Sequence, residues 1–349
     1  MKTILITGGT GFVGSHTSLL LLEKGYKIII LDSNVNSSSR PIKAIKQISN
    51  IKENNFEESL IYIKGDLRDI SLLDNIFKKA KKNNASIDSV FHFAGFKSLE
   101  ESINSPLKYW DNNVCGTICL LQIMQKYSCF NLIFSSSATI FDKSDNKKIS
   151  EEFSLKPINP YGNTKAVIET LLNDIFLAYP DLFRIANLRY FNPIGAHPSG
   201  LMGEDPIGKS SNIFPLILNV ASKELNEIKI FGNDWNTYDG TAVRDYIHVM
   251  DVAEGHILAL NYLLKNEPKI ININLGTGKG YSVLELIRTF EKVNNIKIPY
   301  RFCKRRKGEQ SFVVADNSQL KRLFNWTPRR DLRSMCRDGW EWKLNNLKI

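Results

Sequence analysis

A tyrosine and a lysine four residues apart, Tyr161 and Lys165, are the side chains of this sequence that most directly suggest chemistry. On a helix, residues at positions i and i+4 share one face. An ammonium group beside a phenol stabilises the phenolate, so the pKa of the tyrosine falls from about 10 toward neutrality. Such a tyrosine is a usable general base at physiological pH. The pair alone also fits an ordinary exposed helix, so its meaning depends on the surrounding elements.

A serine-rich segment precedes this pair. The run from Asn131 to Ser135 is typical of a strand and continues into Ser136-Ser137-Ala138-Thr139. The pair itself follows Pro160 and opens a helix that we expect to reach about Ala178. A strand end rich in hydroxyl groups, upstream of a tyrosine–lysine helix, favours a catalytic interpretation once the chain also carries a dinucleotide-binding fold.

The first fourteen residues predict that fold. An apolar strand, Ile4 to Ile6, breaks into a turn with Gly8, Gly11 and Gly14 at intervals of three, and a leucine-rich helix follows. A missing Cβ permits the tight turn at Gly8, close backbone approach to a pyrophosphate at Gly11, and helix–strand packing at Gly14. The first N–H groups of the helix then point at the diphosphate, and the helix dipole favours its charge.

The second strand, Lys27 to Leu31, ends in Asp32. An acid at this place holds the ribose 2′-hydroxyl of NAD and repels the 2′-phosphate of NADP. We therefore expect NAD as the cofactor.

Strand and helix patterns alternate throughout the first half of the chain. This alternation predicts an α/β fold with a doubly wound parallel sheet of the Rossmann type, in which ligands bind at the carboxyl ends of the strands. The candidate residues that fall at such ends are Gly8, Asp32, Asp66, Ala94-Gly95 and Ser137. We therefore expect them to meet at one edge of the sheet.

Beyond residue 191 the segments become shorter and richer in glycine and proline. We predict an NAD-binding domain over residues 1–191 and a second, smaller α/β substrate-binding lobe over residues 192–349. Residues 245–260 read as strand, turn and helix, so this segment is expected to return to the first domain.

The composition is that of an ordinary globular protein. The 349 residues are 43% apolar and 23% charged, with a net charge of +10. The positive charge favours an anionic small substrate. We expect no nucleic-acid partner, because the sequence contains no recognised nucleic-acid-binding module.

The five cysteines are odd in number and form no CxxC pair: Cys115, Cys119, Cys129, Cys303 and Cys336. A reducing, cytoplasmic compartment is the simplest interpretation. The first strand begins at once, and no apolar run reaches the roughly 18 residues that a membrane span needs, so we expect neither a signal peptide nor a membrane segment. The ligand types do not cluster as a metal site requires, and we expect no metal.

The chain resembles the extended short-chain dehydrogenases/reductases, and specifically the UDP-glucose 4-epimerases, over nearly its whole length. The segments that carry the resemblance are FHFAGFKS (91–98), FSSSAT (134–139), YGNTK (161–165), LRYFNPIGAHPSGLMGEDP (188–206), IFGNDW (230–235) and VRDYIHVMD (243–251). The last three distinguish nucleotide-sugar epimerases from other relatives.

The resemblance implies reversible inversion at C4 of a UDP-hexose. Tyr161 would take the proton of the C4 hydroxyl while the C4 hydride passes to tightly bound NAD, and Ser137 would hydrogen-bond that oxygen. Lys165 would lower the pKa of Tyr161 and hold the nicotinamide ribose. The 4-keto sugar would then turn over and receive the hydride on its other face.

The resemblance also assigns binding residues. NAD would be held by Gly8, Gly11, Phe12, Val13, Gly14, Asp32, Ser33, Asn36, Ser37, Asp66, Leu67, Phe91, Ala94, Gly95, Lys97, Asn112, Tyr161, Lys165, Tyr190 and Phe191. The UDP-sugar would be held by Ser137, Asn192, Asn212, Ile213, Phe231, Arg244, Arg306 and Val313. The arginines suit this task on physical grounds, since guanidinium groups match diphosphate oxygens.

Three segments depart from the family pattern. Ile140-Phe141-Asp142 replaces Val-Tyr-Gly after the catalytic serine, and Arg306-Lys307-Gly308-Glu309 replaces Arg-x-Gly-Asp. The longer Glu309 side chain could still reach a ribose or an arginine. Val313 stands where some members carry a tyrosine, and this smaller side chain resembles members that also accept N-acetylated sugars.

Two other kinds of protein could share this fold. A nucleotide-sugar 4,6-dehydratase needs an acid pair to remove water, whereas this chain has Ser137-Ala138-Thr139. A non-catalytic NAD-binding regulator would not need the intact Ser137, Tyr161 and Lys165.

The resemblance also implies a homodimer that pairs two helices of each subunit. Here these helices would be about 107–126 and 164–178. An apolar stripe lies on the second of them at helical spacing: Ile168, Leu171, Leu172 and Ile175. The stripe fits a dimer interface, and it fits packing on its own sheet equally well.

Overall fold

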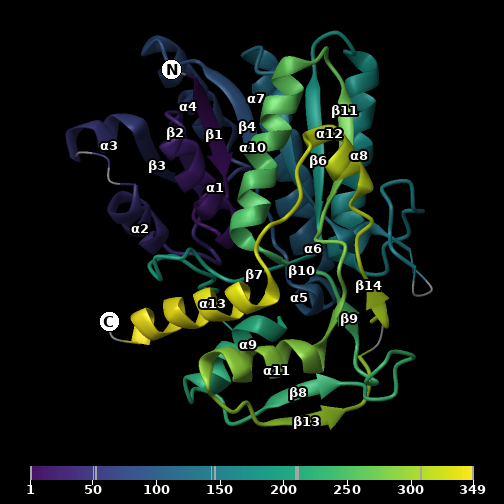
Figure 1. Ribbon diagram of the computed structural model, residues 1–349. Helices are drawn as coiled ribbons and strands as arrows, with labels where there is room; N and C mark the ends of the chain where they lie inside the picture. Colours follow the sequence, from purple (N-terminus) through teal and green to yellow (C-terminus); the bar gives the residue numbers. More distant parts are fainter. Residues whose placement is uncertain are drawn as a thin grey trace. The chain divides into compact units, whose positions relative to one another are not determined.

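The computed structural model describes residues 2–49, 51, 53–142, 144, 147–208, 212–306 and 309–347 (Figure 1). Its contacts divide the chain into two compact units. The first unit comprises residues 1–140, 157–189 and 253–273, and the second comprises residues 141–156, 190–252 and 274–349. The segment 141–156 is thus grouped with the second unit, and the returning segment begins at Ala253 rather than at residue 245.

The first unit is built on a seven-stranded sheet in the order β11-β6-β5-β4-β1-β2-β3. Neighbouring strands from β5 to β3 pair in parallel. All five residues of β1 are buried, which is typical of strands covered on both faces. The strands are β1 (Thr3–Thr7), β2 (Lys27–Asp32), β3 (Leu60–Lys64), β4 (Ile87–His92), β5 (Asn131–Ser137), β6 (Arg184–Tyr190) and β11 (Ile270–Leu275).

Helices cover both faces of this sheet, with α1 and α10 on one face and α4, α7 and α8 on the other (Figure 1). The predicted doubly wound α/β fold is therefore confirmed. The helical segments are α1 (Phe12–Glu23), α2 (Arg40–Ile48), α3 (Glu53–Ser59), α4 (Ile70–Lys82), α5 (Leu99–Asn104), α6 (Pro106–Tyr109), the π-helical η1 (Trp110–Cys115), α7 (Gly116–Lys126), the 3-10 turn η2 (Ala138–Ile140), α8 (Pro160–Ala178) and α10 (Val249–Lys265).

Helix α8, which carries Tyr161 and Lys165, has a firmly defined start. The side chain of Asn159 accepts a hydrogen bond from the Gly162 backbone N–H at 2.8 Å, and Pro160 takes the first helical position. Both features are typical of a helix N-terminus. The position of Tyr161 within the first turn therefore follows from local sequence.

The apolar stripe of α8 packs inside its own unit. Ile168 and Leu172 are buried in the hydrophobic core under the sheet, and Leu171 and Ile175 pack against that core. The structure thus confirms the alternative in which this stripe packs on its own sheet, and the homodimer stays a prediction.

The described residues of the second unit form small sheets and helices around a separate core, to which Phe214, Phe290 and Trp342 contribute. The strands are β7 (Asn192–Ile194) with β10 (Tyr246–His248), β8 (Ile228–Phe231) with β13 (Tyr300–Cys303), and β9 (Val243–Arg244) between β12 (Tyr281–Ser282) and β14 (Phe312–Val313). The helices are α9 (Ile213–Ala221), α11 (Val283–Asn294), α12 (Ser318–Phe324) and α13 (Leu332–Leu347).

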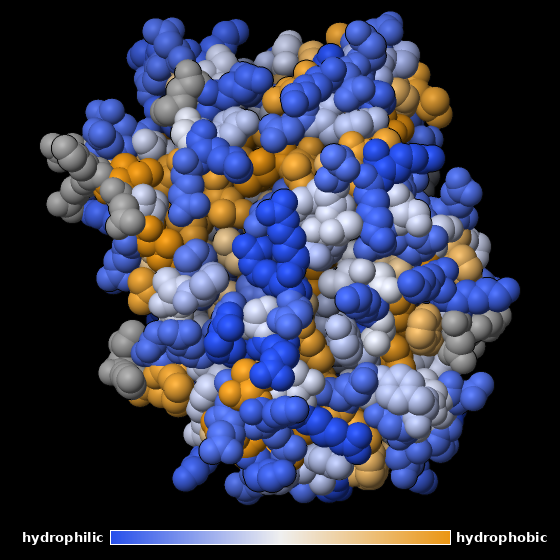
Figure 2. Space-filling model, viewed as in Figure 1, coloured by the Kyte–Doolittle hydropathy of each residue, from blue (hydrophilic) through white to orange (hydrophobic). Residues whose placement is uncertain are grey.

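Hydrophilic side chains cover most of the surface in Figure 2, and apolar side chains interrupt them in patches. Within the part of the chain that the structure describes, none of the helices has the length and apolar character that crossing a membrane requires.

Candidate active site

The catalytic candidates of the first unit meet at the end of β5. The Ser137 hydroxyl oxygen accepts hydrogen bonds from the Thr139 backbone N–H at 3.2 Å and from the Thr139 hydroxyl at 2.9 Å. The Ser137 hydroxyl is also hydrogen-bonded to the Tyr161 phenol. Because Ser137 accepts from Thr139, its own proton is available to the phenol oxygen. Thr139 was not among the predicted site residues, although it stands in the same hydroxyl-rich run.

The pKa of Tyr161 lies above its ordinary value, because burial penalises the phenolate. The Ser137 hydrogen bond and the charge of Lys97 act in the opposite direction. The predicted fall of this pKa toward neutrality is therefore not found. The reason is geometric: the Lys165 ammonium turns to the β5 backbone, donating to the Ser135 carbonyl at 2.6 Å, and it lies 4.7 Å from the centre of the Phe134 ring.

The glycine turn after β1 has the close packing that the sequence predicts. Gly8 has φ +70°, and a Cβ there would stand 2.6 Å from the Ala94 backbone nitrogen. A Cβ on Gly14 would stand 2.4 Å from the Gly8 carbonyl oxygen. Gly11 differs, since the nearest atom to its Cβ would be the same oxygen at 3.2 Å. The turn thus leaves no space for a Cβ at Gly8 or Gly14 and more space at Gly11.

The turn leads into α1, whose described residues include no acid in the first turn and whose N-cap residue, Gly11, makes no side-chain cap. Its leading N–H groups therefore form a site suited to a diphosphate. The residues present fit the cofactor that the fold implies. Phe12 and Val13, in the same turn, are partly exposed.

Asp32 lies at the end of β2, with 7% of its surface exposed. Its carboxylate accepts hydrogen bonds from the backbone N–H groups of Thr10 (3.0 Å) and Asn34 (2.9 Å) and from the Ser37 hydroxyl (3.0 Å). A carboxylate has about four acceptor sites, so one remains for a ribose hydroxyl. Asp32 therefore also fixes the loop that follows β2, and the Ser37 hydroxyl contributes a hydrogen bond within that loop. Ser33 is partly exposed and Asn36 exposed.

Two of the predicted NAD contacts, Asp66 and Leu67, follow β3. Arg68 forms an ion pair with Asp66 at 2.6 Å, and this hydrogen bond holds the pKa of Asp66 below its usual range. The Leu67 side chain is buried and lies beside Gly116 at the start of α7.

One predicted NAD contact in β4 requires a correction. Phe91 is fully buried, so its ring belongs to the core and does not line an open cleft. Phe93, two residues later, is partly exposed and lies 4.8 Å from the buried His256 ring, measured between ring centres. The strand period of two could have distinguished these residues. It places both rings on one face of the sheet, with Phe93 nearer the carboxyl end of the strand, where ligands bind.

The side-chain amide of Asn113 holds the loop after β4, in which the neighbouring predicted NAD contacts lie. Asn113, in η1, accepts a hydrogen bond from the Phe96 backbone N–H at 2.8 Å and another from Asn112 at 2.9 Å, and it donates to the Thr164 hydroxyl at 3.2 Å. Ala94 and Gly95 are partly exposed at this end of β4, and Lys97 is exposed. Asn113 therefore ties this loop to α8.

The cationic candidates of the second unit share an acidic partner. Burial lowers the pKa of Arg244, whose guanidinium donates to the Val243 carbonyl at 2.8 Å. Arg306 lies over the Phe231 ring at 3.8 Å and 3.7 Å from the Glu309 carboxylate. Burial raises the pKa of Glu309, and the charges of Arg244 and Arg306 act in the opposite direction. The Glu309 side chain thus reaches Arg306. Lys307 and Gly308 lie outside the described residues.

The remaining candidates of the second unit lie in several different elements. In β14, Val313 is the register partner of Arg244 in β9. Asn192 pairs with Tyr246, and Asn212 stands at the N-terminus of α9, directly before the partly buried Ile213. Tyr190 and Phe191 are buried.

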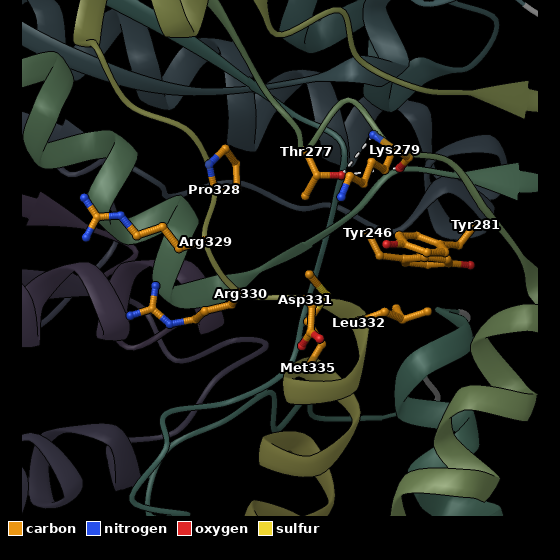
Figure 3. A pocket seen from close by; sticks show the side chains of 10 residues that line it. All are labelled: Tyr246, Thr277, Lys279, Tyr281, Pro328, Arg329, Arg330, Asp331, Leu332 and Met335. Carbon is orange, nitrogen blue, oxygen red and sulfur yellow. Dashed lines mark hydrogen bonds between the residues drawn. The ribbon is translucent and has the colours of Figure 1, made fainter.

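A pocket of about 110 Å³ in the second unit is lined by other residues (Figure 3). It lies among the loop after β11, strand β12 and the start of α13; its lining consists of Tyr246, Thr277, Lys279, Tyr281, Pro328, Arg329, Arg330, Asp331, Leu332 and Met335. Hydrogen bonds between Thr277 and Lys279 fix the loop. None of the predicted site residues lines this pocket. Among the described residues, His, Cys, Asp and Glu side chains form no group of three that could hold a metal ion.

A doubly wound parallel sheet, a glycine turn at a helix N-terminus and a Ser–Tyr–Lys set define the class of short-chain dehydrogenases/reductases that use a dinucleotide. Comparison with known proteins supports this class. A family model described as GDP-mannose 4,6 dehydratase matches residues 5–339. The UDP-glucose 4-epimerase of Bacillus subtilis (strain 168) is 44% identical over 99% of this chain and 97% of its own length.

Solved structures give the same result. The UDP-glucose 4-epimerase from Stenotrophomonas maltophila, crystallised with NAD and formylated UDP-arabinopyranose, is 41% identical with a TM-score of 0.93, covering 100% of this chain and 99% of its own. The Bifidobacterium longum enzyme, in complex with NAD+ and UDP, is 39% identical with a TM-score of 0.92 and covers 99% of each chain. The chain belongs to the UDP-glucose 4-epimerase family.

Proposed function

We propose that this protein is an NAD-dependent isomerase that interconverts UDP-galactose and UDP-glucose by reversible epimerisation at C4. The observation that carries the proposal is the hydrogen bond between Ser137, at the end of β5, and Tyr161. Tyr161 lies on α8, the helix that also carries Lys165. The intact pair argues against a regulator without activity. A dehydratase is not favoured, because the described segment Ser137–Thr139 offers hydroxyl groups where an acid pair is needed.

NAD would be held by the glycine turn and the N-terminus of α1, with Asp32 at the ribose. When bound, it supplies a reversible acceptor for the hydrogen at C4 of the sugar. Tyr161 takes the proton of the C4 hydroxyl and later returns it, and Ser137 hydrogen-bonds that oxygen throughout. Lys165 is anchored on the Ser135 carbonyl, and its protonated form supplies positive charge at this end of β5.

The second unit holds the nucleotide. The guanidinium groups of Arg244 and Arg306 match the diphosphate oxygens, and the Phe231 ring lies beside Arg306. Strong binding of UDP lets the hexose ring turn while the 4-keto sugar stays bound, which inversion at C4 requires.

The first test is an assay of the purified protein with UDP-galactose and no added cofactor, with products resolved by NMR. We expect conversion to UDP-glucose, together with NAD released on denaturation. Formation of a 4-keto-6-deoxy sugar would identify a dehydratase instead. Bound NAD without conversion of UDP-galactose would show that the substrate is a different nucleotide sugar.

Val313 leads to a prediction about the width of the sugar pocket. We propose that N-acetylated UDP-hexoses are also substrates, because this register partner of Arg244 is small. Val313→Tyr is then expected to lower turnover of UDP-GalNAc at least about 10-fold and that of UDP-galactose less than about 3-fold, since added volume excludes the larger sugar. Equal selectivity of the two proteins, or no turnover of UDP-GlcNAc at saturation by the wild type, would contradict this assignment.

We also propose a homodimer, formed through apolar side chains that α6 to α8 leave exposed. Leu107 is 82% exposed and Leu177 is 66% exposed. Aspartate at both positions is expected to convert a dimer into a monomer in light scattering, because burying two charges at an apolar contact is costly. Leu344→Asp, at an exposed site of α13, is the control. A double variant that remains dimeric would place the interface elsewhere.

The cysteine pattern supports a reducing, cytoplasmic compartment for the protein. Cell fractionation followed by immunodetection tests this placement, and recovery in an oxidising compartment would contradict it.

A further inference from the structure

A carboxylate that the proposed chemistry does not use lies one helical turn beyond Lys165. Glu169 is on the same face of α8 and is only 6% exposed. Its Oε1 accepts hydrogen bonds from the Ser136 hydroxyl at 2.5 Å and from Arg189 Nε at 3.1 Å. Its Oε2 accepts from Arg189 Nη2 at 2.7 Å. Two buried side chains therefore converge on both of its oxygens.

These partners stand next to the catalytic groups. Ser136 immediately precedes Ser137 on β5, and Arg189 lies on β6 with 2% of its surface exposed. The Lys165 ammonium donates to the carbonyl of Ser135, the residue before Ser136. Glu169 thus links the catalytic helix to both strands and fixes the register of α8 against β5.

The charges at this place make the carboxylate necessary. Lys165 and Arg189 are two buried cations, and burial of an uncompensated cation is costly. Burial lowers the pKa of Lys165 to about 7, and the Glu169 carboxylate acts in the opposite direction. The bidentate contact directs the Arg189 charge at Glu169.

The other groups around Lys165 do not replace this carboxylate. His92, on β4, is buried with its pKa lowered to about 3, so it is neutral at pH 7. It is hydrogen-bonded to the hydroxyls of Thr7 at 2.7 Å and Thr117 at 2.8 Å. On its own helix Lys165 has Tyr161, and Lys97, in the loop after β4, adds positive charge near that phenol. Among these groups Glu169 supplies the negative charge.

We propose that Glu169 is a positioning residue for epimerisation, which keeps Lys165 protonated and seats the catalytic helix on the end of β5. This assignment rests on the proposed function. Its consequence is that the protonated lysine persists to higher pH than the buried environment alone would allow.

The test compares Glu169→Gln with Asp174→Asn, which removes the same charge from an exposed site on the same helix. Turnover of UDP-galactose is measured against pH on protein that retains its NAD. In Glu169→Gln the alkaline limb of kcat is expected to move down by about one pH unit or more, because one nearby opposite charge is lost. Asp174→Asn should keep the wild-type profile.

A second readout does not depend on the substrate. The pH dependence of Lys165 acetylation by acetic anhydride, followed by mass spectrometry, reports the lysine pKa directly. We expect it to fall in Glu169→Gln and to stay constant in Asp174→Asn. If the wild type lacks epimerase activity, the proposed function fails, while this labelling still decides the role of Glu169.

The double variant Glu169→Gln/Arg189→Met separates the two effects. It also removes the Arg189 charge that faces position 169, so the unfolding midpoint should recover most of any loss seen in Glu169→Gln, while the alkaline limb stays below that of the wild type. A double variant with the wild-type pH profile would show that Glu169 only neutralises Arg189. An unchanged Lys165 labelling curve in both variants would also overturn the proposal.

Discussion

Replacing Tyr161 with phenylalanine is expected to lower kcat for UDP-galactose by roughly 10³-fold, within the range of about 10² to 10⁴ that general acid–base groups contribute. Phenylalanine keeps the ring and its packing on α8 and removes the oxygen that is hydrogen-bonded to Ser137. The C4 hydroxyl then has no base to take its proton. The measurement is kcat from NMR time courses on protein with its NAD content determined in parallel.

Tyr179→Phe is the matched control, because Tyr179 is exposed at the end of the same helix. It should retain turnover within about twofold, as surface substitutions generally do. NAD should stay bound in both variants. A Tyr161→Phe protein with more than a tenth of wild-type turnover would assign proton transfer to another group, with Ser137 the first to test.

Gly8→Ala is expected to have the largest effect on stability. The backbone at this glycine has φ +70°, and the new Cβ would stand 2.6 Å from the Ala94 backbone nitrogen, which cannot move without shifting the end of β4. Strain and backbone displacement together should lower the free energy of unfolding by about 2–5 kcal/mol. Thermal unfolding and the NAD content after purification report the two consequences, and both should fall.

Gly25→Ala separates strain from contact. Gly25 has a similar φ of +79°, but a Cβ there would meet nothing within 4 Å. Only the strain of a left-handed backbone then lowers the free energy of unfolding, by roughly 1–2 kcal/mol, and NAD should remain bound. If Gly8→Ala were no more destabilising than Gly25→Ala, close packing of the glycine turn against β4 would not matter for the fold.

The architecture could be predicted because each element carries a local signal. The apolar run of β1, the glycine spacing and Asp32 are consecutive in the chain, and βαβ chirality then leaves few topologies. The start of α8 is likewise encoded locally, by Asn159 and Pro160. Tyr161, Lys165 and Ser137 follow from motifs that the resemblance to the epimerases makes specific.

Other features depend on contacts between distant segments. Glu169 meets Arg189 across twenty residues, and Asn113 bonds Thr164 across fifty-one, so no short motif announces either. The direction of the Lys165 side chain depends on a β5 carbonyl, which is why helical spacing alone misjudged its effect on Tyr161. The burial of Phe91, and with it the choice between Phe91 and Phe93, required the packed core.

The central claim is that the hydrogen at C4 leaves the sugar and returns to it within one catalytic cycle. The most direct measurement uses UDP-galactose deuterated at C4, with the purified protein and no added cofactor, and locates the label in the product by NMR and mass spectrometry. The account predicts UDP-glucose that retains deuterium at C4, with no transfer to unlabelled substrate molecules present in the same mixture. Loss of the label to water would contradict it, because the C4 hydrogen would then leave as a proton.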